Sequence, residues 1–227
     1  MATTNTPTTT IFEKMDLMKT KYSIKGIFEI HITVQCDSDN DMSLFLERCR
    51  LHNIKPIIIE LSNGDYVKQV MTSSFIVGQY KDEIMAKTKA TVMKLFENTV
   101  LFDKIVRIKV ESLARNPGVP LDGNDEPDKY FEFHYKIAIT NTEDYDKVRN
   151  IIKSFGGRLS RNAFKNLETN KHYFITKRVH NGGQIVAMAE YNELNDVLCS
   201  SGYIPLKTEA EFVVFDSNYN LDSGWSI

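Results

Sequence analysis

The chain has 227 residues, of which 42% are hydrophobic and 26% are charged, and its formal net charge is −2. This composition is typical of a folded protein with one large domain or two small ones, and it argues against a disordered chain. The near-neutral charge also argues against a general nucleic-acid coat, because non-specific affinity for phosphate backbones requires an excess of Lys and Arg.

The cysteines and the N-terminus indicate the compartment. Cys36, Cys49 and Cys199 are an odd number without C-x-x-C spacing, which fits neither a disulfide framework nor a zinc site. No stretch approaches the roughly 20 apolar residues of a membrane helix, and the Thr-rich N-terminus lacks a positive start and an apolar run. We therefore expect a cytoplasmic or nuclear protein without membrane contact, and a disordered segment over residues 1–20.

The first half of the chain predicts strands and helices in the order βαββαβ. Its opening stretch, GIFEIHITVQ at residues 26–35, alternates apolar and polar residues with the period of two that is typical of a half-buried strand. The elements expected after it are a helix at 41–52, strands at 55–61 and 66–77 joined by an Asn63-Gly64 turn, a helix at 81–97 and a closing strand at 104–112.

The second half repeats this order after a linker. Residues 115–129 contain three prolines, two glycines and four acidic residues, which is the composition of a surface linker. The elements expected after it are a strand at 130–138, a helix at 142–155, strands at 158–164 and 171–179, a helix at 184–199 and a closing strand at 207–215.

Matching segments indicate that the two halves are copies of one unit. FEIHITV in the first half corresponds to FEFHYKI in the second, and RIKVE corresponds to KTEAE. We therefore predict an α+β fold that duplicates a ferredoxin-like βαββαβ unit, at residues 21–114 and 130–227. Each antiparallel sheet is expected to carry its helices on the outer face.

Ionisable side chains are expected to gather on the uncovered face of each sheet. The first and last strands of a ferredoxin-like unit are neighbours, so their outward residues lie together, and they line one central cleft if the halves face each other. The residues expected there are Glu29, His31, Thr33, Arg107, Lys109 and Glu111 from the first half, and Glu132, His134, Lys136, Glu209 and Glu211 from the second. Such a cluster suits acid–base or phosphate chemistry, although cross-strand charge pairs that only stabilise a solvated sheet have the same composition.

The motif His31-Ile32-Thr33 resembles the His-x-Thr or His-x-Ser motif that two-lobed 2H phosphoesterases carry on a strand of each lobe. The resemblance implies that His31 and His134 are the catalytic acid and base on a phosphodiester or cyclic phosphate, and that Thr33 holds phosphate oxygens. Lys136 stands where the second hydroxyl would be, and it could bind phosphate as a point charge. Arg107 and Lys109 are further candidates for phosphate binding.

A second motif competes with the first. Glu132-x-His134-x-Lys136 is similar to the E-x-E-x-K signature of the triphosphate tunnel enzymes, although His replaces the central acid and the motif lies in mid-chain. In that family a barrel of two ferredoxin-like halves uses carboxylates for metal and basic residues for polyphosphate. The resemblance implies a Mg²⁺ site, since hard oxygen donors suit this ion. The candidate ligands of this metal ion, or residues that would support those ligands, are Glu29, Glu111, Glu132, Glu209 and Glu211.

The alternative is a protein that is not an enzyme. It would be a binding or structural module that recognises a small anionic or nucleotide-like ligand, or a protein partner. The asymmetry of the predicted cleft favours it, because Thr33 is matched by Lys136 and Lys109 by Glu209. The only tryptophan, Trp225, either caps the core or anchors a protein partner. A local basic group that could contact nucleic acid comprises Arg158, Arg161, Lys165, Lys171, Lys177 and Arg178.

Overall fold

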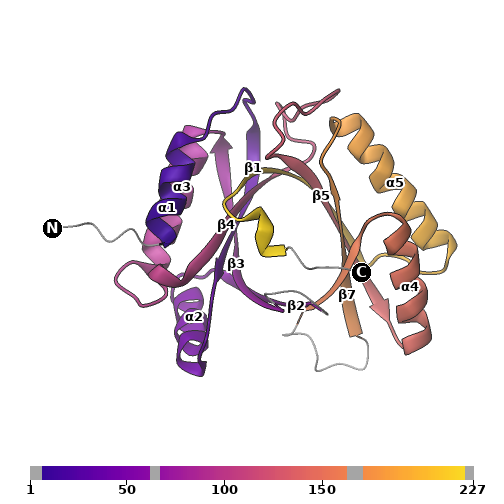
Figure 1. The fold of residues 1–227 in the computed structure, drawn as a ribbon, viewed down its shortest axis with the longest axis horizontal. Helices are drawn as coiled ribbons and strands as arrows, with labels where there is room; N and C mark the ends of the chain where they lie inside the picture. The colour runs from indigo at the N-terminus through magenta and orange to yellow at the C-terminus, as the bar shows by residue number, and fades with distance from the viewer. Residues whose placement is uncertain (1–6, 62–66, 163–170, 223–227) are drawn as a thin grey trace.

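The computed structural model of the protein describes residues 7–61, 67–162 and 171–222. Eight strands form a closed barrel in the order β1-β3-β2-β6-β7-β5-β8-β4, with the helices outside it (Figure 1). The strands are β1 (Lys25–Val34), β2 (Lys55–Leu61), β3 (Lys68–Gln79), β4 (Ile105–Leu113), β5 (Tyr130–Ile139), β6 (Arg158–Asn162), β7 (Lys171–Val179) and β8 (Lys207–Asp216). The helices are α1 (Pro7–Leu17), α2 (Asp39–Leu51), α3 (Asp82–Phe96), α4 (Thr142–Ser154) and α5 (Gln184–Ser200), with short 3₁₀ turns η1 (Phe102–Lys104) and η3 (Tyr219–Asp222).

The predicted α+β duplication is confirmed. Strands β4, β1, β3 and β2 lie in this order in the first half, and β8, β5, β7 and β6 repeat the order in the second. The two sheets then join edge to edge, because β4 pairs with β8 and β2 pairs with β6 in antiparallel register. The faces that carry no helices are thus enclosed as the inner surface of the barrel.

In β1 and β5 the period of two separates an apolar outer face from an inner face that is mostly polar. Phe28, Ile30 and Ile32 of β1 are fully buried in the core beneath the helices, and Phe131 and Phe133 of β5 take the equivalent places in the second half. Helices α1, α2 and α3 cover the first half and α4 and α5 the second (Figure 1). The intervening polar residues therefore project into the barrel.

The predicted elements are present, with ends displaced by at most two residues wherever both ends are described. The predicted Asn63-Gly64 turn lies outside the described residues. Within the described ranges, no helix combines the length and the apolar character that crossing a membrane requires.

The N-terminus differs from the predicted disordered segment. Residues 7–17 form helix α1, and Ile11 and Met15 on one side of it are buried in the core. Phe12 adds an edge-on contact with the ring of Phe102, with 6.3 Å between ring centroids. The Thr-rich start hides this helix in the sequence, because its stability comes from packing rather than from helix propensity.

Candidate functional site

All the predicted site residues lie on the inner face of the barrel, because side chains directly opposite on paired strands share one face of a sheet. In the first half the opposite pairs are Glu29 with Glu111, His31 with Lys109 and Thr33 with Arg107. In the second half they are Glu132 with Glu211, His134 with Glu209 and Lys136 with Lys207. The barrel therefore brings the two expected clusters around one axis.

His31 is held as a cation in the first half. Its Nε2 lies 2.9 Å from a Glu111 oxygen and 3.6 Å from a Glu29 oxygen, and its Nδ1 lies 2.9 Å from the Thr72 carbonyl oxygen. Burial would lower the pKa of His31, but the hydrogen bond and charge of Glu111, together with the charge of Glu29, raise this pKa above 6.5. Because the carbonyl oxygen only accepts, Nδ1 must donate to it, so both ring nitrogens carry a proton.

This raised pKa gives stability a pH dependence. The stabilisation contributed by protonated His31 is complete below pH 6.5 and is lost as the pH rises through the higher pKa of the folded state. We expect His31→Gln to remove that part of the decline in unfolding free energy between pH 6 and pH 9, measured by urea denaturation. An unchanged pH profile in the variant would contradict the charged assignment.

His134 repeats this arrangement in the second half. Its Nε2 lies 3.2 Å from a Glu132 oxygen and 3.8 Å from a Glu211 oxygen, and its Nδ1 lies 3.1 Å from the Thr176 hydroxyl. Each histidine thus contacts the glutamate two positions before it and a glutamate on the closing strand of its own half. The His134 side chain is 24% exposed against 13% for His31, so it is the more accessible of the two.

Lys109 joins the two halves. Its Nζ lies 2.7 Å from Glu111 and 2.6 Å from Glu132, while the second Glu132 oxygen lies 2.5 Å from Nε of Arg178. Burial would raise the pKa of Glu111, but Lys109 and then His31 lower it to about 2. Burial would likewise raise the pKa of Glu132, which Arg178 and Lys109 hold well below its usual range. Both carboxylates are therefore ionised within a continuous series of ion pairs.

The pKa of Glu211 is shifted in the opposite direction. Burial, followed by the nearby charges of Glu111 and Glu29, raises the pKa of Glu211 well above 4.5. This environment favours the protonated form of Glu211, whereas that of Glu111 and Glu132 favours the carboxylate.

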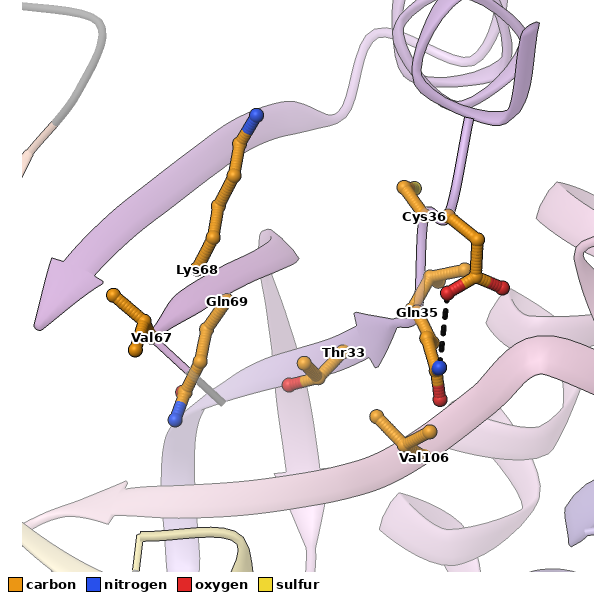
Figure 2. Close-up of a pocket in the computed structure, with 9 residues that line it drawn as sticks. Thr33, Gln35, Cys36, Val67, Lys68, Gln69 and Val106 are labelled. Atoms are coloured by element: carbon orange, nitrogen blue, oxygen red, sulfur yellow. Dashed lines mark hydrogen bonds between the residues drawn. The ribbon is translucent and has the colours of Figure 1, made fainter. Parts of the chain in front are cut away.

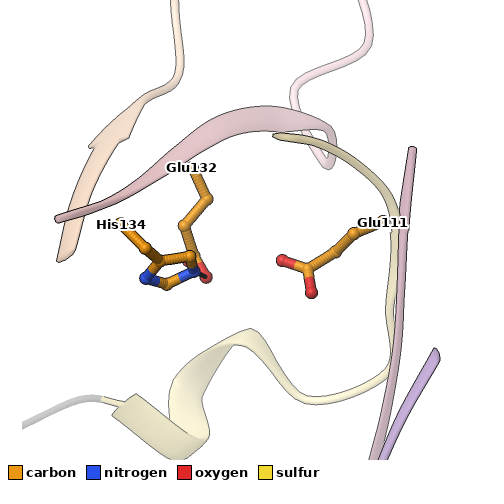
Figure 3. Close-up of side chains that lie close together, drawn as sticks. All are labelled: Glu111, Glu132 and His134. Carbon is orange, nitrogen blue, oxygen red and sulfur yellow. Dashed lines mark ion pairs between the residues drawn. The ribbon is translucent and has the colours of Figure 1, made fainter. Parts of the chain in front are cut away.

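Three side chains from both halves converge where a metal ion could bind. One ligand atom each from Glu111, Glu132 and His134 lies within 4.8 Å of the others. Glu111 points from its own strand toward the other two, which are neighbours on β5 (Figure 3). Two carboxylates and an imidazole are ligands of divalent cations such as Mn²⁺, and carboxylates also suit Mg²⁺.

Two arginines and two aspartates complete the inner face beside the C-terminal turn. Nη1 of Arg107 lies 2.9 Å from Oδ2 of Asp222, and Nε of Arg107 lies 2.9 Å from Oδ1 of Asp216. Nη2 of Arg178 lies 2.5 Å from the same Oδ2 of Asp222. Sequence reasoning missed Asp216, Asp222 and the inward position of Arg178. The alternation Phe174, Thr176, Arg178 along β7 could have placed Arg178, whereas no pattern marks Asp222.

Three other predicted residues lie away from the convergence of Glu111, Glu132 and His134. Thr33 is buried and lines a pocket of about 230 Å³ together with Gln69 and Lys68 (Figure 2). Glu209 pairs with Lys207, and Lys136 lies opposite Lys207 at the same end of the sheet.

The predicted basic group does not form one surface. Lys177 projects outward and its Nζ lies 2.9 Å from Glu190, whereas its neighbour Arg178 projects inward. Arg161 pairs with Glu60 at 2.7 Å. Lys165 and Trp225 lie outside the described residues.

Comparison with known proteins assigns no family. No family model matches the chain, and no curated protein matches it in sequence. Among solved structures, it is similar to the small subunit of acetolactate synthase from Thermotoga maritima, with a TM-score of 0.30 and 10% identity over 84% of this chain and 95% of that one. A mutant chlorite dismutase from Candidatus Nitrospira defluvii matches with a TM-score of 0.28 and 10% identity, over 93% of this chain and 98% of that one. A heme-binding protein from Thermus thermophilus matches with a TM-score of 0.25 and 8% identity, over 86% of this chain and 93% of that one. Similarities this low carry no argument about function.

Proposed function

We propose that the barrel interior is a phosphohydrolase site for a nucleotide-like or polyphosphate ester and that it works with a divalent cation. The observation that carries the proposal is the convergence of Glu111, Glu132 and His134 beside the cations Lys109 and Arg178. Carboxylates for metal and basic groups for phosphate, on the inner face of a barrel built from two ferredoxin-like halves, are also what the resemblance to the triphosphate tunnel enzymes implies.

Each part of this cluster has a role in phosphoryl transfer. A bound Mg²⁺ or Mn²⁺ would offset charge on the phosphate oxygens and lower the pKa of an attacking water. Lys109 and Arg178 are positioned to stabilise negative charge that develops on the transferring group, since their partner Glu132 lies within the proposed metal site. The raised pKa of Glu211 favours its protonated form, which could donate a hydrogen bond to a phosphate oxygen.

The surroundings of His31 favour this mechanism over one in which two histidines share the proton transfers. Both nitrogens of His31 donate, one to the Thr72 carbonyl and one to Glu111, so the ring has no free nitrogen to act as a base. His134 is more exposed and belongs to the proposed metal site. The two histidines are thus equivalent in position but not in role.

Apolar side chains mark one end of the barrel as the entrance for an organic ester. Phe75 lies opposite Glu29, Val77 lies opposite Ile27, and these three apolar side chains are 60%, 65% and 42% exposed. Leu113, opposite Glu211, is 40% exposed. A nucleoside or similar group could contact these residues while its phosphates reach the charged interior.

The test is hydrolysis of nucleoside triphosphates, inorganic tripolyphosphate and 2′,3′-cyclic nucleotides with Mg²⁺, with Mn²⁺ and with a chelator. We expect metal-dependent turnover that falls on the order of 100-fold or more in Glu111→Gln and in His134→Ala. The matched control is Glu60→Gln, which removes an acid paired with arginine outside the barrel and should leave turnover unchanged. Metal-independent turnover lost equally in His31→Ala and His134→Ala would favour the two-histidine mechanism. Absence of turnover on every substrate would favour the binding module.

A further inference from the structure

We propose that Arg107, Arg178 and Gln69 form a phosphate subsite inside the barrel and that the carboxylate of Asp222 occupies this subsite until an anionic ligand displaces it. The proposal rests on the proposed function in one respect, since it assigns a phosphoryl group as the ligand. It adds a role for the C-terminal turn, which enters the centre of the barrel in Figure 1.

The contacts of Asp222 are those of a bound oxyanion. Its Oδ2 accepts from Nη1 of Arg107 at 2.9 Å and from Nη2 of Arg178 at 2.5 Å, and its Oδ1 accepts from Nε2 of Gln69 at 3.0 Å. Its backbone carbonyl oxygen also accepts from Arg158 at 3.2 Å. The Asp222 side chain is only 2% exposed. Donors from three separate strands thus converge on one carboxylate, which a phosphate group could replace because arginine recognises both.

The arginines are held in place by partners other than Asp222. Arg107 retains two contacts with Asp216, and Arg178 retains its contact with Glu132. The guanidinium of Arg178 also lies over the ring of Tyr130, 5.0 Å from its centroid. The donors would therefore keep their positions when the carboxylate leaves, and such preorganisation lowers the cost of binding a ligand.

The charges favour an anion in place of Asp222. When the Asp222 carboxylate leaves, Arg107 and Arg178 lose an anion that they share, and their side chains are only 4% and 12% exposed. Another anion would restore this shared ion pair in a region that is largely shielded from water. Arg178 contacts both Asp222 and Glu132, so a phosphate here would adjoin the proposed metal site.

The test measures binding without turnover. Inorganic tripolyphosphate and inorganic phosphate are titrated calorimetrically, without divalent metal, into the wild type, Asp222→Asn and the control Glu60→Gln. Removing the competing carboxylate is expected to tighten tripolyphosphate binding about tenfold in Asp222→Asn and to leave Glu60→Gln at the wild-type affinity. Equal affinity in all three proteins would overturn the proposal. A gain in affinity in these titrations, together with no hydrolysis in the assays that contain Mg²⁺ or Mn²⁺, would support the subsite while contradicting the proposed reaction.

A second measurement covers the case in which Asp222→Asn does not fold. Trp225 is the only tryptophan of the chain and lies three positions after Asp222. Displacement of the turn by tripolyphosphate should shift the Trp225 emission of the wild type in a saturable way. Emission that stays constant while calorimetry detects binding would show that the ligand binds without moving the turn, and the proposal would fail.

Discussion

Replacing Glu132 with Gln is expected to lower the free energy of unfolding by about 3 kcal/mol, because it leaves two buried cations without their shared partner. Lys109 and Arg178 both contact this carboxylate, and Glu132 is 1% exposed. Screening by water is therefore weak. Urea denaturation at pH 7 measures the loss, and a change below about 0.5 kcal/mol, the size typical of a surface substitution, would show that the ion pairs contribute little.

Glu211→Gln is the matched control with the opposite expectation. Glu211 also projects into the barrel, but burial, Glu111 and Glu29 raise its pKa and so favour the neutral acid. Replacing this acid by a neutral amide should leave the unfolding free energy unchanged or raise it.

The pH dependence of this control has a defined sign. An acid whose pKa is raised by folding stabilises the protein fully below its unfolded value of 4.5, and this contribution declines as the pH rises. The advantage of Glu211→Gln over the wild type should therefore grow between pH 5 and pH 8. A Glu211→Gln variant as unstable as Glu132→Gln would indicate that Glu211 is ionised.

The period of two in the first strand of each half was enough to predict that its glutamate and histidine project to the inner face. In β1 and β5 the apolar positions fix one face against the helices, so His31 and His134 had to project to the other. The match between FEIHITV and FEFHYKI then placed the two histidines at equivalent positions. These are local properties, which a sequence pattern records directly.

The closure of the barrel and the contacts of its interior depend on tertiary packing. Pairing of β4 with β8 and of β2 with β6 joins edges that are distant in the chain, and no periodicity reports which edges meet. Asp222 comes from a four-residue turn without a helical or strand pattern. The central role of Arg178 was hidden because its neighbour Lys177 made the segment read as a basic run.

The ion pair between Arg107 and Asp222 is expected to have the second large effect on the free energy of unfolding. Arg107→Met is expected to lower the unfolding free energy by about 3 kcal/mol, because it leaves two buried carboxylates, Asp216 and Asp222, without this cation. The side chains of Arg107 and Asp222 are 4% and 2% exposed. Asp222→Asn alone should cost about 2 kcal/mol, since it weakens hydrogen bonds from charged donors.

The double variant decides whether the two residues act through each other. Once Arg107 is absent, the Asp222 carboxylate has lost one of its two arginine partners that contact Oδ2, so neutralising it costs less. The two losses should therefore fall short of additivity by about 1.5 kcal/mol at pH 7. Burial would raise the pKa of Asp222, but Arg107 and Arg178 lower it below 3.8, so the coupling should persist at pH 5 and decline only as the pH falls below that range. Additive losses at pH 7 would mean that the two residues do not act through each other, and that Arg107 does not hold the C-terminal turn in the barrel.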